Sequence, residues 1–107
     1  MGDYEKALPL YQRTLEIKEK VLGSQHPSFA TTLNNLATLY RKIGDYEKAL
    51  PLYQRALDIR EKVLGSEHPD FATTLDNLAG LYENMGAYTK ALPLYQKTEK
   101  NFDYSKK

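Results

Sequence analysis

The chain has 107 residues, a length that supports one domain with a modest core. Its formal charge of +1, from 15 basic and 14 acidic residues, argues against a nucleic-acid or anionic-membrane binder, which normally carries a basic excess. The absence of Cys excludes disulfides, thiolate zinc sites and cysteine nucleophiles, and no apolar run approaches the ~18 residues of a membrane span. We therefore expect a soluble cytoplasmic protein.

One internal repeat dominates the sequence. The heptapeptide KALPLYQ occurs at residues 6–12, 48–54 and 90–96, at intervals of 42 residues. A period of about 20 to 50 residues indicates stacked helical or strand units, each unable to bury its apolar face alone. We expect a single solenoid over residues 1–107, with repeat units 2–43, 44–85 and a partial 86–98, and with 99–107 as a polar C-terminal cap.

The first helix that can be read within one period spans residues 27–43. At 100° per residue its apolar side chains fill about half the circle. These are Phe29, Ala30, Leu33, Leu36, Ala37, Leu39, Tyr40 and Ile43. Gly44 ends this helix, and the carboxylate of Asp45 is placed to cap the next one.

The second helix spans residues 46–64 and has an apolar arc of about 180°, wide enough to touch neighbours on two sides. The arc contains Tyr46, Ala49, Leu50, Leu52, Tyr53, Ala56, Leu57, Ile59, Val63 and Leu64. Gly65 stops the helix, and His68-Pro69 opens the next one, because proline is tolerated in a first turn.

Pro51 lies inside this second helix, on its solvent face beside Glu47 and Arg55. Proline removes one backbone N–H, but a carbonyl freed on the wet side can bond water. We expect a continuous, bent helix. The alternative is a helix that begins only at Pro51, which would leave residues 46–50 without a purpose.

The residues that recur in each period resemble the tetratricopeptide repeat. The pattern Leu33-x-x-Leu36-Ala37-x-x-Tyr40 precedes Ala49-x-x-x-Tyr53, and it recurs 42 residues later. The usual Trp is Leu, the usual Gly is Ala, and the closing Pro is missing. The longer unit, with HPDFATTLDNLAGLY and ALPLYQRALDIREKVLG, resembles kinesin light chain repeats and covers nearly all of residues 2–98.

The resemblance implies an all-α, right-handed α-solenoid of five helices, about two and a half repeats, ordered second, first, second, first, second. It also implies a concave groove, lined by the first helices, that binds a partner peptide or protein. Mapped onto this chain, the groove positions are Thr31, Asn34, Asn35, Thr38, Arg41 and Lys42, and then Thr73, Asp76, Asn77, Gly80, Glu83 and Asn84.

Four of the ten differences between the two full repeats fall at these groove positions. They are Asn34/Asp76, Thr38/Gly80, Arg41/Glu83 and Lys42/Asn84. Each changes the chemistry of the side chain, whereas a difference such as Lys18/Arg60 is mild. A scaffold repeated nearly verbatim with its groove varied fits a recognition surface; neutral drift at tolerant surface sites is the alternative. The amides of Asn35 and Asn77 can pair with a peptide backbone or, alternatively, with neighbouring helices.

No pattern of catalytic residues or cofactor ligands is present. His26 and His68 occupy equivalent loops about one repeat step apart, and a metal site needs several converging ligands. We interpret them as structural His-Pro helix starts. No nucleophile elbow or phosphate-binding glycine motif occurs, and the tyrosines recur at repeat spacing as packing residues. We expect no enzyme activity, metal or cofactor.

The two ends of the chain differ. Where the second repeat has Leu57, Ile59 and Leu64, the third copy has Glu99, Asn101 and Lys106, the polar face of a solenoid cap. The N-terminal helix keeps its internal-type apolar residues and should seek a partner, which predicts a homo-oligomer or helix-swapped homodimer. Met1 is expected to mark the edge of a fragment with further repeats upstream; the near identity of the repeats fits either a recent duplication or a consensus design.

The sequence therefore predicts a scaffold that binds a protein or peptide, without nucleic acid or membrane as a partner. The alternative is a structural segment that assembles with itself or with adjacent repeats.

Overall fold

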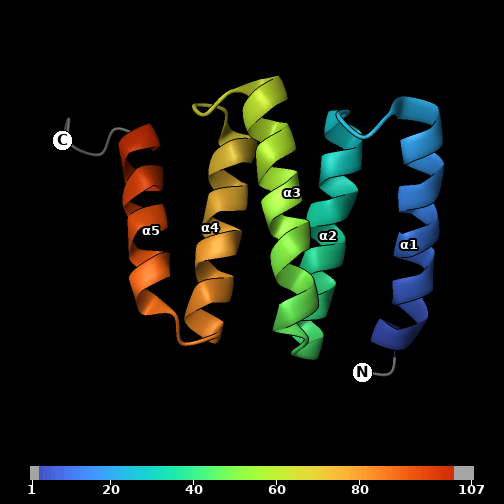
Figure 1. Ribbon diagram of the computed structural model, residues 1–107, viewed down its shortest axis with the longest axis horizontal. Coiled ribbons are helices and arrows are strands. Elements are labelled where there is room, and N and C mark those ends of the chain that lie inside the picture. The colour runs from blue at the N-terminus through green and yellow to red at the C-terminus, as the bar shows by residue number, and fades with distance from the viewer. Residues whose placement is uncertain (1–2, 103–107) are drawn as a thin grey trace.

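The computed structural model describes residues 3–102, with side chains described for residues 3–98. This part of the chain forms five helices and no strand. The helices lie side by side in chain order across the molecule, from α1 at one end to α5 at the other (Figure 1). They are α1 (Asp3–Leu22), α2 (Pro27–Ile43), α3 (Tyr46–Leu64), α4 (Pro69–Asn84) and α5 (Tyr88–Phe102). The expected all-helical, five-helix fold is confirmed, and the bounds of α2 and α3 match the sequence prediction.

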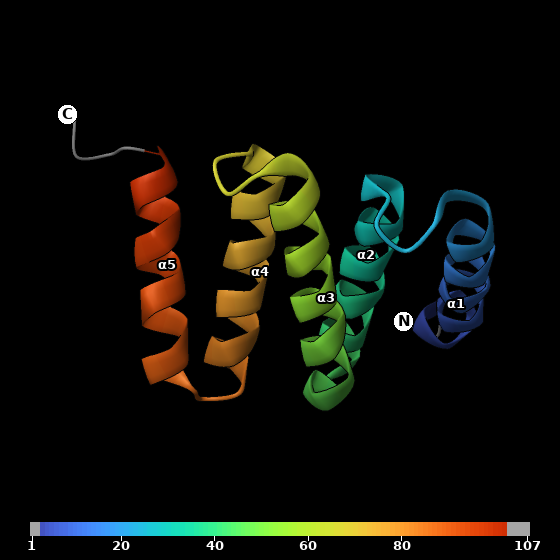
Figure 2. The ribbon, with the colours of Figure 1, turned by 45° about the horizontal axis from the view of Figure 1, so that its top comes forward.

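Each helix packs against the next, and α2 also contacts α4. The turned view keeps the same single row, with α3 beside both α2 and α4 (Figure 2). The resulting slab measures 44 × 31 × 19 Å. Apart from the α2–α4 contact and one exposed ion pair between α1 and α3, packing is between consecutive helices, so the two helices at the ends are each covered on one side only.

The helix starts are set by side chains that accept backbone N–H groups. His26 Nδ1 accepts from the N–H of Ser28 at 3.0 Å, and His68 Nδ1 accepts from that of Asp70 at 3.0 Å. Asp45 caps α3 by accepting from Lys48 N. The prediction of structural His-Pro helix starts is confirmed, and the imidazole nitrogen does the work that Ser or Asp usually does at this position.

The prolines and glycines mark the same places in each repeat. Pro9, Pro51 and Pro93 all lie inside helices and on exposed positions, so the continuous helix is confirmed and a helix beginning at Pro51 is excluded. Gly44 and Gly65 follow the ends of α2 and α3 with φ of 99° and 95°, a conformation that a side chain would strain.

The core is made of the predicted apolar arcs. One cluster joins Phe29, Ala30 and Leu33 of α2 to Ala56 and Ile59 of α3. A second cluster links α2, α3 and α4; its buried members are Ala37, Ala49, Tyr53, Leu78 and Leu81.

Repeat-related positions occupy matching environments, since Leu33 and Leu75 are both buried, as are Phe29 and Phe71. The predicted arcs were wrong at two positions. Ile43 and Val63 lie in the last turns of α2 and α3 and are exposed, because a helix end has fewer neighbours to cover it.

The two terminal helices were predicted from the sequence to differ. Helix α1 buries none of its side chains, in agreement with the expected unpartnered apolar face. The predicted polar cap rests on Glu99, Asn101 and Lys106, which lie outside the residues whose side chains are described. On the described part of α5, Tyr88 and Leu92 remain exposed.

Candidate interaction site

The twelve predicted groove residues lie on the two helices that the resemblance assigned to the groove, and we call them the α2–α4 polar row. Six come from α2 and six from α4, and these helices contact each other. Most members of the polar row are exposed or half-buried, and Gly80 alone among them is buried. The row is therefore mainly a surface feature, but several of its members are already engaged within the chain.

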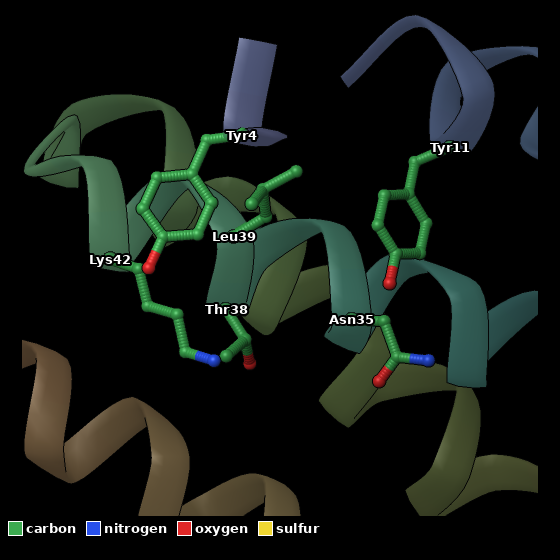
Figure 3. A pocket seen from close by; sticks show the side chains of 6 residues that line it. All are labelled: Tyr4, Tyr11, Asn35, Thr38, Leu39 and Lys42. Carbon is green, nitrogen blue, oxygen red and sulfur yellow. The ribbon is translucent and has the colours of Figure 1, made fainter. Parts of the chain in front are cut away.

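A pocket lies where the polar row meets α1, and we call it the α1–α2 pocket. Its volume is about 210 Å³. Figure 3 shows the phenol of Tyr4 directed towards Lys42 and that of Tyr11 directed towards Asn35. The lining residues are Tyr4, Tyr11, Asn35, Thr38, Leu39 and Lys42. Three of the predicted site residues thus share a hollow with two aromatic rings of α1.

Asn35 and Asn77 occupy equivalent positions but have different partners. Asn77 Nδ2 donates to Asn34 Oδ1 at 3.1 Å, which joins α4 to α2. The side chain of Asn35 makes no hydrogen bond with any of the described residues, since no α2-type helix precedes it in that part of the chain. Of the two amides proposed to bind a peptide, Asn35 has all of its hydrogen-bonding capacity free, while Asn77 has already committed a donor.

Three of the four varied positions are explained by one contact between repeats. Arg41 Nε donates to Asn84 Oδ1 at 2.6 Å, and the guanidinium lies over Gly80. A Cβ atom added at Gly80 would sit 2.6 Å from Arg41 Nη2. Glycine in place of threonine at position 80 therefore leaves room for the guanidinium of Arg41. Asparagine in place of lysine at position 84 supplies the oxygen that accepts its hydrogen bond.

The same differences change how a tyrosine of each repeat is satisfied. Between α2 and α3 the hydroxyls of Thr38 and Tyr53 share a hydrogen bond of 2.7 Å. Between α4 and α5 Gly80 offers no hydroxyl, and Tyr95 instead donates to Glu83 Oε1 at 2.9 Å. Burial, followed by this bond and the charge of Glu83, raises the pKa of Tyr95. The differences between the two repeats at the polar row thus change hydrogen bonds within the protein itself. Variation for ligand recognition alone would not require such changes.

The Lys18/Arg60 difference, interpreted as mild from the sequence, has a structural consequence. Lys18 Nζ donates to Thr32 Oγ1 at 2.9 Å on the following helix. Arg60 makes the equivalent bond to Thr74 at 2.6 Å and also donates from Nη2 to Thr31 Oγ1 at 3.1 Å on the preceding helix.

The forked guanidinium of Arg60 therefore ties three helices together, where an ammonium ties two. Burial lowers the pKa of Arg60, and the charge of Asp70 opposes that shift. The side chain is buried without a bonded carboxylate, so its hydrogen bonds to hydroxyl and carbonyl oxygens are what satisfy it.

Three pocket residues were not among the predicted site residues: Tyr4, Tyr11 and Leu39. The tyrosines recur in every repeat, so the sequence indicated packing. Their counterparts Tyr46 and Tyr53 do pack in the core. Their position in the chain was the sequence signal that could have found them: Tyr4 and Tyr11 lie on the first described helix, where no preceding described helix covers them and they stay accessible to a ligand.

Within the described residues, no group of three or more His, Cys, Asp or Glu side chains is arranged to hold a metal ion. None of the helices in that range combines the length and hydropathy required of a membrane span.

The fold and the repeated motif together define a helical repeat protein, and the comparisons with known proteins identify the family. The sequence profile of the tetratricopeptide repeat matches residues 1–62 and, in a second alignment, residues 28–103. The chain therefore belongs to the tetratricopeptide repeat family. No curated protein matches it significantly.

Solved structures give the subtype. A putative kinesin light chain of Podosopora anserina with nearly identical TPR-like repeats superposes with a TM-score of 0.87 at 28% identity, over 97% of this chain and 49% of that one. A single-substitution variant of that protein gives a TM-score of 0.88 at the same identity and coverage. BtubC (BKLC) from P. vanneervenii shares the fold, with a TM-score of 0.88 at 24% identity over 94% of this chain and 39% of that one. The repeats are of the kinesin light chain-like type, and this chain spans less than half the length of these proteins.

Proposed function

We propose that this chain is a protein-interaction module that binds an extended segment of a partner protein along the α2–α4 polar row, with its anchor in the α1–α2 pocket. The observation that carries the proposal is the pocket itself, where the unbonded amide of Asn35 and the ammonium of Lys42 stand beside two tyrosine rings. Tetratricopeptide repeats are commonly protein-interaction modules, which supports this class of function.

The chemistry of the pocket indicates what kind of segment fits. The faces of Tyr4 and Tyr11 accept an apolar or aromatic side chain. The amide of Asn35 both donates and accepts, as an extended backbone requires. Lys42 forms no ion pair with a described residue, so it is available to a carboxylate. The expected ligand carries an acidic side chain close to an apolar one.

The test is to select linear peptides from a random display library on the purified chain and to measure their affinity for variants. The double variant Asn35→Ala/Lys42→Glu should weaken the selected peptides by about 10- to 100-fold, since hydrogen bonds to charged groups are worth about 1.5–3 kcal/mol. Lys62→Glu, on an exposed position of α3, is the control for charge reversal and should leave affinity unchanged. Peptides that bind the double variant as well as the parent would refute the proposal.

The second candidate is structural assembly, with this chain acting as a homo-oligomeric scaffold through α1. It is favoured by the exposed apolar side chains of α1, of which Leu10 is 67% and Val21 74% accessible. Sedimentation equilibrium decides it: a dimer that Leu10→Glu dissociates supports assembly, and a monomer at millimolar concentration excludes it. Neither candidate involves catalysis by this chain, and both belong in the cytoplasm.

A further inference from the structure

The α2–α4 polar row reverses its charge from one helix to the next. On α2 the row carries Arg41 and Lys42, and that helix has no Asp or Glu. On α4 the row carries Asp76 and Glu83, and that helix has no Lys or Arg. Three of the four row positions that differ between the repeats change the charge, and each change makes the second repeat more negative. The row is therefore basic on α2 and acidic on α4.

The two cations of α2 differ in how far they are engaged within the chain. Arg41 is committed, because its Nε donates to Asn84 Oδ1 at 2.6 Å and its guanidinium lies over Gly80. Lys42 is exposed, lines the α1–α2 pocket beside Tyr4 (Figure 3), and forms no ion pair with a described residue. Lys42 is therefore the cation of α2 that an acidic group of a ligand can reach.

The two carboxylates of α4 lie towards α5, on the side away from Lys42. Glu83 Oε1 accepts a hydrogen bond from the hydroxyl of Tyr95 at 2.9 Å, which holds this carboxylate in place. Burial, then that bond and the charges of Glu83 and Asp76, raise the pKa of Tyr95. Both carboxylates thus act on one phenol. Both residues are exposed, and neither forms an ion pair with a described residue.

The packing of α2 on α4 sets the distance between the two kinds of charge. Asn77 Nδ2 of α4 donates to Asn34 Oδ1 of α2 at 3.1 Å. The bond from Arg41 to Asn84 joins the same two helices. Helices in direct contact have their axes about 8–10 Å apart. An extended segment advances about 3.3 Å per residue, so it crosses from one helix to the other in about three residues.

We propose that the segment bound along the polar row carries both charges in a fixed order: an acidic side chain pairs with Lys42, and a basic side chain about three residues away pairs with Asp76 and Glu83. This inference rests on the peptide-binding function proposed above and adds the charge order of the ligand. A segment with charges of one sign only would place one of them against a like charge of the row. The row thereby discriminates among segments and determines which part of the segment lies over α2.

The test uses the peptides selected on the parent chain, labelled with fluorescein and measured by fluorescence anisotropy. They should carry a Lys or Arg about three residues from their acidic residue. Replacing that basic residue by Ala should weaken binding about 2- to 5-fold, the size of one exposed ion pair. Because the pair is exposed, raising the salt concentration should reduce the difference between the two peptides.

A variant of the protein identifies the partner of the basic side chain. Asp76→Lys reverses one charge of α4 and breaks no hydrogen bond within the described residues, so the fold is retained. It should weaken the selected peptides about 5- to 10-fold, since it removes an attraction and adds a repulsion. The Ala-substituted peptides, which lack the cation, should not be weakened. Glu61→Lys, on an exposed position of α3, is the matched control and should leave affinity unchanged.

Exchanging the charges of the row should exchange the preference. The double variant Lys42→Glu/Asp76→Lys should bind a peptide whose acidic and basic residues have been interchanged more tightly than it binds the original peptide. Selected peptides without a basic residue at that spacing, or peptides that bind Asp76→Lys as tightly as the parent, would overturn the charge order and leave peptide binding intact. A chain that selects no peptide at all would overturn both proposals.

Discussion

Helices α1 and α3 have almost the same sequence, but α1 buries none of its side chains and α3 buries five. Residues 4–22 and 46–64 differ only at Thr14/Ala56, Glu16/Asp58 and Lys18/Arg60. Ile17 is 51% accessible, while its counterpart Ile59 is 2% accessible. The difference lies in the neighbours: α3 is held between α2 and α4, whereas α1 packs against α2 and reaches α3 through the exposed ion pair of Glu19 with Arg55. The amphipathic pattern of a helix thus shows which of its faces can be buried, and the neighbouring helices determine whether that face is buried.

The largest expected effect comes from truncating the same side chain on each helix. Ile59→Ala should destabilise the protein by about 2–5 kcal/mol, because it removes buried carbons and leaves a cavity among Phe29, Leu33 and Ala56. Ile17→Ala should cost about 0.5 kcal/mol or less, as an accessible substitution. Urea denaturation followed by circular dichroism measures both. Equal costs at the two positions would show that α1 is covered in solution.

The Lys18/Arg60 pair tests whether the hydrogen bond from Arg60 Nη2 to Thr31 contributes to stability. Arg60→Lys should keep the bond to Thr74, as Lys18 keeps its bond to Thr32, but should lose the bond to Thr31. We expect a loss of about 1.5 kcal/mol in the free energy of unfolding, since the donor is charged and the bond to Thr31 is partly buried. The reverse change, Lys18→Arg, should be nearly neutral because no preceding helix of the described chain offers a hydroxyl.

A double-mutant cycle tests whether the stability lost in Arg60→Lys comes from the hydrogen bond to Thr31. Thr31→Ala and Arg60→Lys should be less than additive, with most of the effect of either change already present in the other. Full additivity would mean that the bond to Thr31 contributes nothing measurable and that the arginine is retained for packing.

The smallest effect is expected at Gly80, where two terms oppose each other. Gly80→Ala raises helix propensity by about 1 kcal/mol but displaces the guanidinium of Arg41 from Asn84. The net change in the free energy of unfolding should lie within about 0.5 kcal/mol of zero. In an Arg41→Ala background the same substitution should stabilise by about 1 kcal/mol, because nothing remains to be displaced. The same outcome in both backgrounds would show that Arg41 does not occupy the space over Gly80.

Much of the fold was predictable from the sequence because the same helix-capping, helix-stop and apolar patterns recur in successive repeats. The Gly44 and Gly65 stops, the Asp45 cap and the apolar arcs fixed the bounds of α2 and α3 before any packing was known. Ile43 and Val63 were the exceptions, because a wheel counts residues by angle and takes no account of the missing neighbour at a helix end.

The candidate site was predictable only in part. The twelve positions of the polar row follow from the helical period and the family resemblance, and they stay proposed ligand contacts. Their internal partners did not follow from the sequence: the bond from Asn77 to Asn34 and that from Arg41 to Asn84 each join residues 43 positions apart. The α1–α2 pocket needed the relative placement of α1 and α2, because its aromatic walls come from tyrosines that are core residues elsewhere.

By itself, the sequence determined that 42-residue units of two helices repeat, where each helix starts and stops, and which face of each is apolar. Those properties depend on capping, on backbone conformation and on the helical period, all of which act within a few residues. Only the tertiary structure decided that Tyr11 and Leu10 remain open while Tyr53 and Leu52 pack against α2. A side chain is buried only when two surfaces pack together, and the local sequence pattern of a helix specifies only one of them.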